Sequence, residues 1–193
     1  MSEENRTKKL LEMREEEKPN FWKSKAGKET REWIVSIVAA LLAFLVIRTF
    51  LFTMIRVDGE SMIETLQNGD RLFVTVLDVK LGGVENEDIV ICNYPGEGNT
   101  YFVKRVIAQA GQTVEIRDGV TYVDGEAREE EYIDHPARTD YGPYTVPEGK
   151  VFVMGDNRAN SRDSRSVGAL EERMIVGKVR CVWWPLNRIG LVE

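Results

Sequence analysis

Residues 113–125, TVEIRDGVTYVDG, combine alternating apolar residues with two Asp-Gly pairs. Such alternation favours a β-strand with one buried face, and an Asp-Gly pair between two strand-like runs is typical of a tight hairpin turn. The stretch therefore predicts a hairpin around Asp118-Gly119. Similar apolar runs recur after residue 56, and they are RLFVTVL (71–77), DIVICNY (88–94), TYFVKRVIA (100–108), KVFVMG (150–155) and MIVGKVRCVWW (174–184).

These runs predict a mainly β domain over residues 56–193, built as an antiparallel sheet or a partly closed barrel. The segment 126–149 is polar and contains three prolines, so we expect it to leave the main sheet as a loop-rich excursion. Together with the hairpin before it, this segment would form a smaller inserted subdomain at about residues 113–149.

The segment before this domain is apolar. Residues 33–55, WIVSIVAALLAFLVIRTFLFTMI, contain Arg48 as their single charge. As a helix they would span about 34 Å, enough to cross a hydrocarbon core of about 30 Å. A cleaved signal peptide and a buried core helix are the alternatives. The 32 highly charged residues that precede the run, and the absence of a small-residue cleavage site after it, favour an uncleaved transmembrane anchor.

The flanking cations predict the orientation of this anchor. Six Lys or Arg side chains lie in the 20 residues before Trp33, against two in the 20 residues after Ile55. Basic flanks stay in the cytoplasm. We therefore expect a cytoplasmic charged tail over residues 1–32, flexible or weakly helical, and an extracytoplasmic domain over residues 56–193.

Composition argues against several classes of protein. Lys and Arg number 26 against 32 Asp and Glu, which gives a net charge of −6, whereas nucleic-acid binders usually have a basic surface. Cys92 and Cys181 permit at most one disulfide, and together with His135 they are too few and too scattered for a structural zinc site. Any Ser-His triad would have to use His135.

Two residues outside these patterns are candidates for chemistry. Ser61 lies in GESMIETL (59–66), where a nearby glycine lets the backbone approach a developing oxyanion. Lys104 lies in a strand-like run beside apolar side chains, so burial should lower its pKa toward that of a base. Its neighbour Arg105 points to the other face and stays protonated. Taken alone, a turn serine and a solvated edge-strand lysine are the better explanations.

The segment GDNRANSRDSR (155–165) is the most specific, because eleven residues, nine of them polar, directly follow the apolar run VFVM. Its acidic, amide and basic side chains can form a network of ion pairs and hydrogen bonds, and the members expected there are Asp156, Asn157, Asp163 and Arg165. Ser161 and Ser164 could each donate a hydrogen bond to a neutral amine. A surface loop that binds calcium is the alternative, but its oxygen atoms do not follow the EF-hand spacing.

The motifs, taken in the order in which they occur along the chain, resemble those of bacterial type I signal peptidases with a single membrane anchor. The resemblance covers about residues 32–193. It rests on the anchor, GESMIETL, GDRLFV (69–74), KRVIAQAGQ (104–112), GDNRANSRDSR and GKVRCVWWP (177–185).

The resemblance implies a role for each matching residue. It makes Ser61 the nucleophile, Lys104 the general base, Ser161 the serine that orients the lysine amine, Asp163 and Arg165 a supporting ion pair, and Asp156 a structural acid. The backbone of Ser61 would form the oxyanion hole, with Gly59 where some members have a hydroxyl. Secretory preproteins would be the substrates, and membrane lipid would be a partner. The enzyme would be a monomer that binds no nucleic acid and needs no metal or cofactor.

Three positions depart from the family's pattern. Glu64 replaces the usual proline three residues after the serine, AQAGQ (108–112) keeps Gly111 of a longer motif, and Phe102 replaces a common tyrosine. Of these, Glu64 is the one able to disturb the serine turn. Two other functions stay open: a non-catalytic envelope protein on the same fold, and a Ser-Lys protease that cleaves only itself, as phage-type repressors do.

Overall fold

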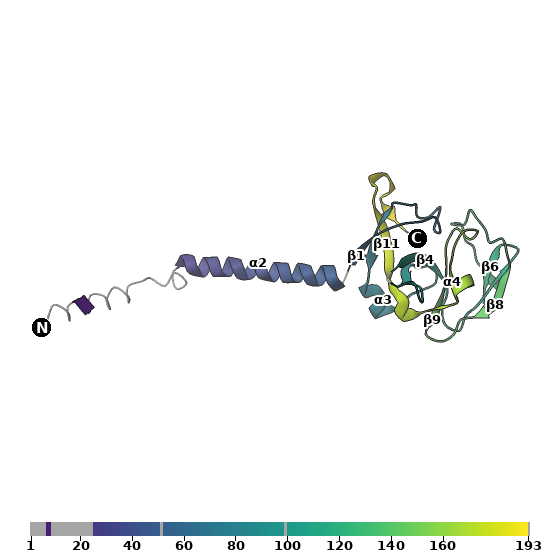
Figure 1. The fold of residues 1–193 in the computed structure, drawn as a ribbon, viewed down its shortest axis with the longest axis horizontal. Coiled ribbons are helices and arrows are strands. Elements are labelled where there is room, and N and C mark those ends of the chain that lie inside the picture. The colour runs from purple at the N-terminus through teal and green to yellow at the C-terminus, as the bar shows by residue number, and fades with distance from the viewer. Residues whose placement is uncertain (1–6, 9–24, 51, 99, 193) are drawn as a thin grey trace. The chain divides into compact units, whose positions relative to one another are not determined.

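The computed structural model describes residues 7–8, 25–50, 52–98 and 100–192 (Figure 1). The chain divides into two compact units, Met1–Ile47 and Arg48–Glu193, which are described separately. The helix α2 (Lys25–Phe50) begins in the first unit, and its side chains between Lys28 and Leu45 are exposed. Most of the predicted charged tail, residues 1–6 and 9–24, lies outside the described residues.

The apolar run 33–55 is not one continuous helix. The helix ends at Phe50, and Phe52–Arg56 form the strand β1. This strand pairs with β2 (Arg71–Thr75) along its whole length, so the end of the predicted anchor belongs to the sheet. Its aromatic and β-branched residues suit a strand whose backbone is paired. Among the described residues, no helix combines the length and the apolar character needed to cross a membrane.

The second unit contains a large antiparallel sheet, which confirms the predicted mainly β class. In the described part of the chain it has eight strands in the order β1-β2-β11-β3-β4-β9-β10, with β12 paired to β11. Its remaining strands are β3 (Ile89–Asn93), β4 (Tyr101–Ala108), β9 (Lys150–Met154), β10 (Leu170–Glu171), β11 (Ile175–Trp184) and β12 (Gly190–Leu191). Short helices connect them at α3 (Leu77–Gly82), α4 (Ser164–Val167), η2 (Glu172–Met174) and η3 (Leu186–Arg188).

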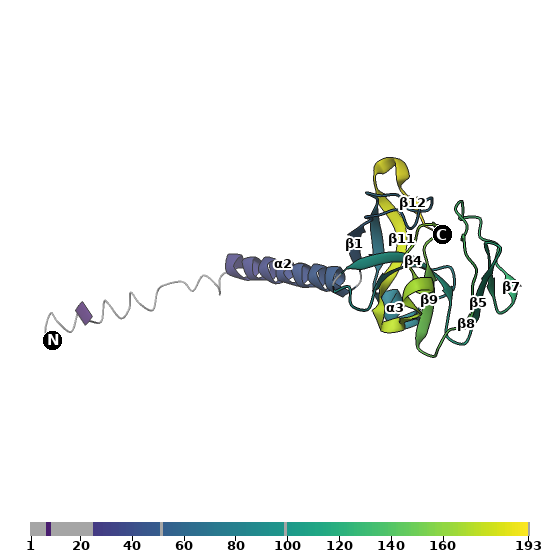
Figure 2. The ribbon, with the colours of Figure 1, turned by 45° about the vertical axis from the view of Figure 1, so that its right-hand side comes forward.

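A second, four-stranded sheet follows β4. It has the order β7-β6-β5-β8, formed by β5 (Thr113–Arg117), β6 (Val120–Val123), β7 (Glu126–Ala127) and β8 (Tyr141–Thr145). Figures 1 and 2 both show it at the side of the main sheet. Strands β5 and β6 pair up to Arg117 and Val120, which confirms the predicted hairpin. Asp118 and Gly119 have φ values of 51° and 80°, a left-handed pair that an Asp-Gly turn accommodates.

Buried apolar side chains join these parts. One cluster contains Phe152 and Met154 of β9 together with Val114 and Ile116 of β5, so the two sheets share a core. A second cluster contains Met62 and Leu66, which follow Ser61, packed with residues of β2, β3 and β11. The segment that carries Ser61 is therefore fixed to the main sheet by burial.

Candidate active site

Ser61 lies at the start of a short turn between β1 and β2. Met62 and Leu66 are buried on one side of this turn, and the Leu66 N–H donates to the Met62 carbonyl at 2.8 Å. Ser61 itself is half-buried, whereas the Glu64 side chain points into solvent. Since the turn forms with an exposed residue at position 64, the glutamate does not prevent this local structure.

Lys104 is brought to Ser61 by β4, where it pairs with Val90 of β3. Its side chain is 2% exposed, and its Nζ lies 2.6 Å from the Ser61 Oγ, within hydrogen-bond distance. Burial lowers the pKa of the Lys104 amine, an effect that nearby acidic groups oppose. The two candidate residues from different motifs are thus in contact, and the amine is placed to accept the hydroxyl proton when it is neutral.

Cys92 of β3 lies in the same buried region as Lys104. Burial raises the pKa of its thiol to about 12, so the thiol is neutral at physiological pH and adds no charge beside the amine. Both cysteines lie in the described part of the chain, and neither forms a disulfide.

The segment 155–165 lies against the pair formed by Ser61 and Lys104. Arg165 donates two side-chain hydrogen bonds to Asp163, each at 2.8 Å, and the Gly155 N–H donates to the same carboxylate at 3.1 Å. Burial opposes the ionisation of Asp163, but the hydrogen bonds and charge of Arg165 lower the pKa of its carboxyl overall. The predicted ion pair between Asp163 and Arg165 is therefore formed.

Asp156 belongs to a different pair. It accepts two hydrogen bonds from Arg105, at 3.0 Å from Nε and 2.8 Å from Nη2, and one from the Thr65 hydroxyl at 2.6 Å. Arg105 follows Lys104 in β4, and Thr65 lies in the turn after Ser61. Asp156 thus connects the two segments that carry the candidate dyad. Sequence reasoning missed this partner, although an arginine on an apolar strand needs a buried acid.

A second arginine of the segment reaches the smaller sheet. Arg158 is buried and donates two hydrogen bonds to Glu130, at 2.9 and 2.6 Å, and one to the Thr121 hydroxyl of β6 at 2.7 Å. Its Nε also donates to the Gly155 carbonyl at 3.1 Å. The sequence analysis assigned no role to Arg158, because its acidic partner lies in the excursion.

The two serines of the segment differ. The Ser164 hydroxyl accepts from the Val153 N–H at 3.0 Å, so it supports β9 rather than the lysine. The Ser161 Oγ is buried and lies close enough to Asp163 to help lower the pKa of that carboxyl. The orienting role expected for Ser161 stays a prediction.

Gly155 has no room for a side chain. A Cβ there would lie 2.3 Å from the Ser61 carbonyl oxygen and 2.3 Å from the Ser161 Oγ. The glycine thus lets the segment approach Ser61 closely. Gly59, on the other side of Ser61, has a left-handed φ of 119°, and its N–H points to the Asn68 side chain at 3.4 Å.

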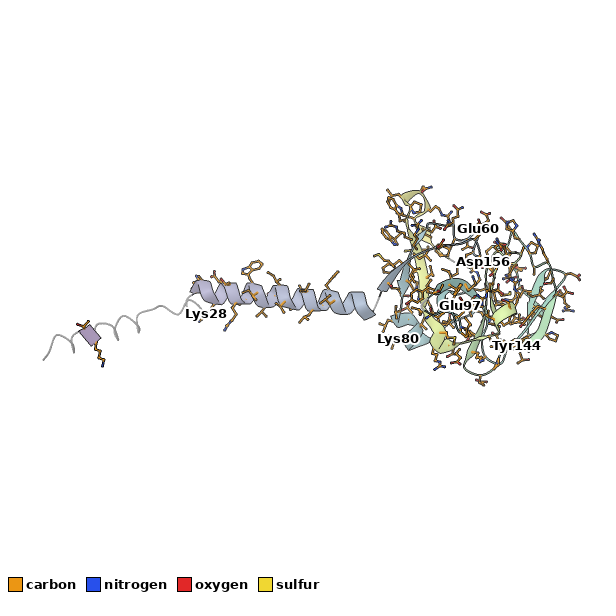
Figure 3. All side chains as sticks on the ribbon, viewed as in Figure 1. Lys28, Glu60, Lys80, Glu97, Tyr144 and Asp156 are labelled. Carbon is orange, nitrogen blue, oxygen red and sulfur yellow. The ribbon has the colours of Figure 1, made fainter. Side chains whose placement is uncertain are left out.

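Figure 3 labels Glu60, next to Ser61, and Asp156 in the same region of the second unit. The contacts of Asn157 with this turn agree with that view, since its N–H donates to the Ser61 carbonyl. No cluster of three or more acidic, histidine or cysteine side chains suited to a metal ion occurs among the residues described.

This site of a serine and a buried lysine on an antiparallel sheet is typical of serine hydrolases that use a lysine base. The family model described as signal peptidase, peptidase S26, matches residues 30–184. The chain belongs to this family.

Similar proteins carry the same name. Signal peptidase I T of Bacillus subtilis is 41% identical over 192 residues, which cover 92% of this chain and 98% of that protein. Signal peptidase IB of Staphylococcus aureus is 34% identical over 178 residues, covering 83% and 92%. A crystal structure of a signal peptidase I from Enterococcus faecalis is 31% identical in sequence. Its superposition covers 49% of this chain and 95% of the Enterococcus chain, with a TM-score of 0.45.

Proposed function

We propose that the chain is a membrane-bound serine endopeptidase that removes N-terminal signal peptides from exported preproteins. The contact between the Lys104 amine and the Ser61 hydroxyl, 2.6 Å long and buried on the lysine side, carries this proposal. Family membership and the names of the relatives support the substrate class.

The reaction proceeds through an acyl-enzyme. Neutral Lys104 takes the Ser61 proton while Oγ attacks the carbonyl carbon of a small residue at the cleavage site. The C=O electrons move onto oxygen, where the Ser61 N–H donates to the negative charge. As the C–N bond breaks, the Lys104 ammonium returns the proton to the leaving amine. Water activated by Lys104 then releases the acyl group, and the dyad is restored.

Asp163, Arg165 and Asp156 act as supports in this proposal. Asp163 is ionised by its contacts with Arg165, and Asp156 holds the Ser61 turn against β4 through Thr65 and Arg105. Ser161 orients the lysine amine in this proposal, as the matching motif of the family implies, and its buried hydroxyl lies close to both the Ser61 carbonyl and Asp163.

We also propose that residues within 33–55 anchor the enzyme in the membrane, with the catalytic domain on the extracytoplasmic side. The apolar sequence and the surplus of cations before Trp33 support this orientation. A nucleophile tethered near the membrane suits preproteins whose signal segments are still in the bilayer. The enzyme would act as a monomer, without nucleic acid, metal or cofactor.

The test is cleavage of a purified preprotein by the full chain in detergent, with the product sequenced from its new N-terminus. Cleavage in trans after a small residue is expected, and Ser61→Ala and Lys104→Ala should each abolish it while the melting temperature shows a folded protein. Lys104→Arg should also be inactive, because guanidinium does not accept the proton. Cleavage by Ser61→Ala would refute the dyad. Self-cleavage alone, or binding without cleavage, would favour the other two functions.

A further inference from the structure

Asn157 contacts the backbone on both sides of Ser61. Its N–H donates to the Ser61 carbonyl at 3.1 Å, and its side-chain Nδ2 donates to the Glu60 carbonyl at 3.2 Å. Its Oδ1 accepts from the Asn160 N–H at 3.1 Å. Since the two ends of the amide differ in donating and accepting, these partners fix its orientation. The side chain is buried, so water does not compete for these bonds.

These two contacts determine the geometry of Ser61. A trans peptide unit is planar, and its C=O and N–H point in opposite directions. The Glu60 carbonyl and the Ser61 N–H belong to one such unit, so the contact with Nδ2 sets the direction of the Ser61 N–H. The Ser61 carbonyl belongs to the next unit. Holding both planes fixes φ and ψ of Ser61, and with them the direction of the Cα–Cβ bond from which Oγ reaches Lys104.

We infer that Asn157 is a positioning residue for both the nucleophile and the oxyanion donor of Ser61, an inference that rests on the proposed function. In the acylation step the substrate carbonyl oxygen gains negative charge while the Oγ proton passes to Lys104. The Ser61 N–H must point at that oxygen from the start, because reorientation during the reaction would add to the barrier. Asn157 touches none of the reacting atoms and acts through the peptide planes.

The close approach at Gly155 supports this assignment. The segment 155–157 lies so near the Ser61 carbonyl that a Cβ at Gly155 would clash with it. The strand β9 ends at Met154, so the contacts of Asn157 transmit the position of the sheet directly to the nucleophile. An exposed loop residue with one contact would not do this.

The test uses Asn157→Asp, which keeps the acceptor for Asn160 but places an oxygen against the Glu60 carbonyl. We expect kcat on a preprotein to fall by about 10²-fold while KM changes by less than about threefold. A peptide aldehyde that forms a tetrahedral adduct with Ser61 should lose about the same factor in affinity. The affinity for a product peptide, which the enzyme does not cleave further, should stay the same. Asn160→Asp, with the same charge change on an exposed side chain of the same segment, should retain wild-type kinetics.

Asn157→Ala is the second variant, because it removes the Glu60 contact without introducing a charge, and it should change kcat and aldehyde affinity in the same direction. Wild-type kcat in either folded variant, or a rise in KM alone, would overturn the inference. A wild-type protein that fails to cleave, or a Ser61→Ala variant that cleaves, would instead overturn the proposed function.

Discussion

Replacing Asp156 with alanine removes the carboxylate that Arg105 and Thr65 contact. The Asp156 and Arg105 side chains are 0% and 1% exposed, so the guanidinium would stay buried and charged. Removing one partner of such a pair costs about 3–5 kcal/mol. Arg105 would keep the Glu87 carbonyl at 3.1 Å and the face of the Tyr132 ring at 3.7 Å. We therefore expect the lower end of this range, a loss of about 3 kcal/mol in the free energy of unfolding.

Thermal unfolding of the full chain, followed by near-ultraviolet circular dichroism, measures this loss. At about 2–4 °C per kcal/mol for a domain of this size, the melting temperature should fall by about 6–12 °C. Glu171→Ala is the matched control, because it breaks a pair with Arg173 whose side chains are 40% and 79% exposed. Such a pair contributes at most about 1 kcal/mol. The double variant Arg105→Met, Asp156→Leu should recover most of the loss. A shift in Asp156→Ala no larger than in the control would refute the reasoning.

Three further predictions concern the dyad and the segment beside it. Lys104→Met should abolish cleavage but raise the melting temperature at neutral pH. Burial lowers the pKa of the Lys104 amine, so the folded protein binds this proton less tightly than the unfolded chain does, and the protonated lysine destabilises the fold. Wild-type stability should accordingly rise with pH from that lowered pKa up to the ordinary value of 10.5, and an unchanged pH dependence in the variant would contradict this assignment. Gly155→Ala should reduce kcat by more than about 10²-fold, since the new Cβ would displace Ser61, whereas Gly82→Ala, with open space at its Cβ, should retain activity. Ser161→Ala should lower kcat by about 10- to 10³-fold with little change in melting temperature, and a fall in melting temperature at full kcat would assign the serine to stability alone.

The strands follow from local sequence, whereas the candidate dyad follows from the resemblance of several motifs to those of a known family. Alternation of apolar residues and the Asp118-Gly119 pair predict the β5–β6 hairpin, because both signals lie within a few residues. Ser61 and Lys104 are in contact, as their motifs imply, although 43 residues separate them. The order of several motifs along the chain indicated this contact, which the periodicity of apolar residues alone does not predict.

The pairings that sequence reasoning missed are long-range. Asp156 pairs with Arg105, 51 residues away, and Arg158 with Glu130, 28 residues away. Local composition shows only that charged residues are present, whereas their partners depend on how the strands are ordered. The boundary between α2 and β1 was missed for a related reason. Residues 52–55 are as apolar as the helix before them, and only pairing with β2 makes them a strand.

The bond between Arg158 and Glu130 has a consequence for how the domain folds. It connects the segment beside Ser61 to the smaller sheet, and β5 and β9 also share buried side chains. The smaller sheet is thus part of the same cooperative unit as the dyad, and the domain should unfold in a single transition. Shortening the excursion would leave the Arg158 guanidinium buried without its acid. Such a deletion would destabilise the segment 155–165 beside the dyad, even though no residue that reacts with substrate had been removed.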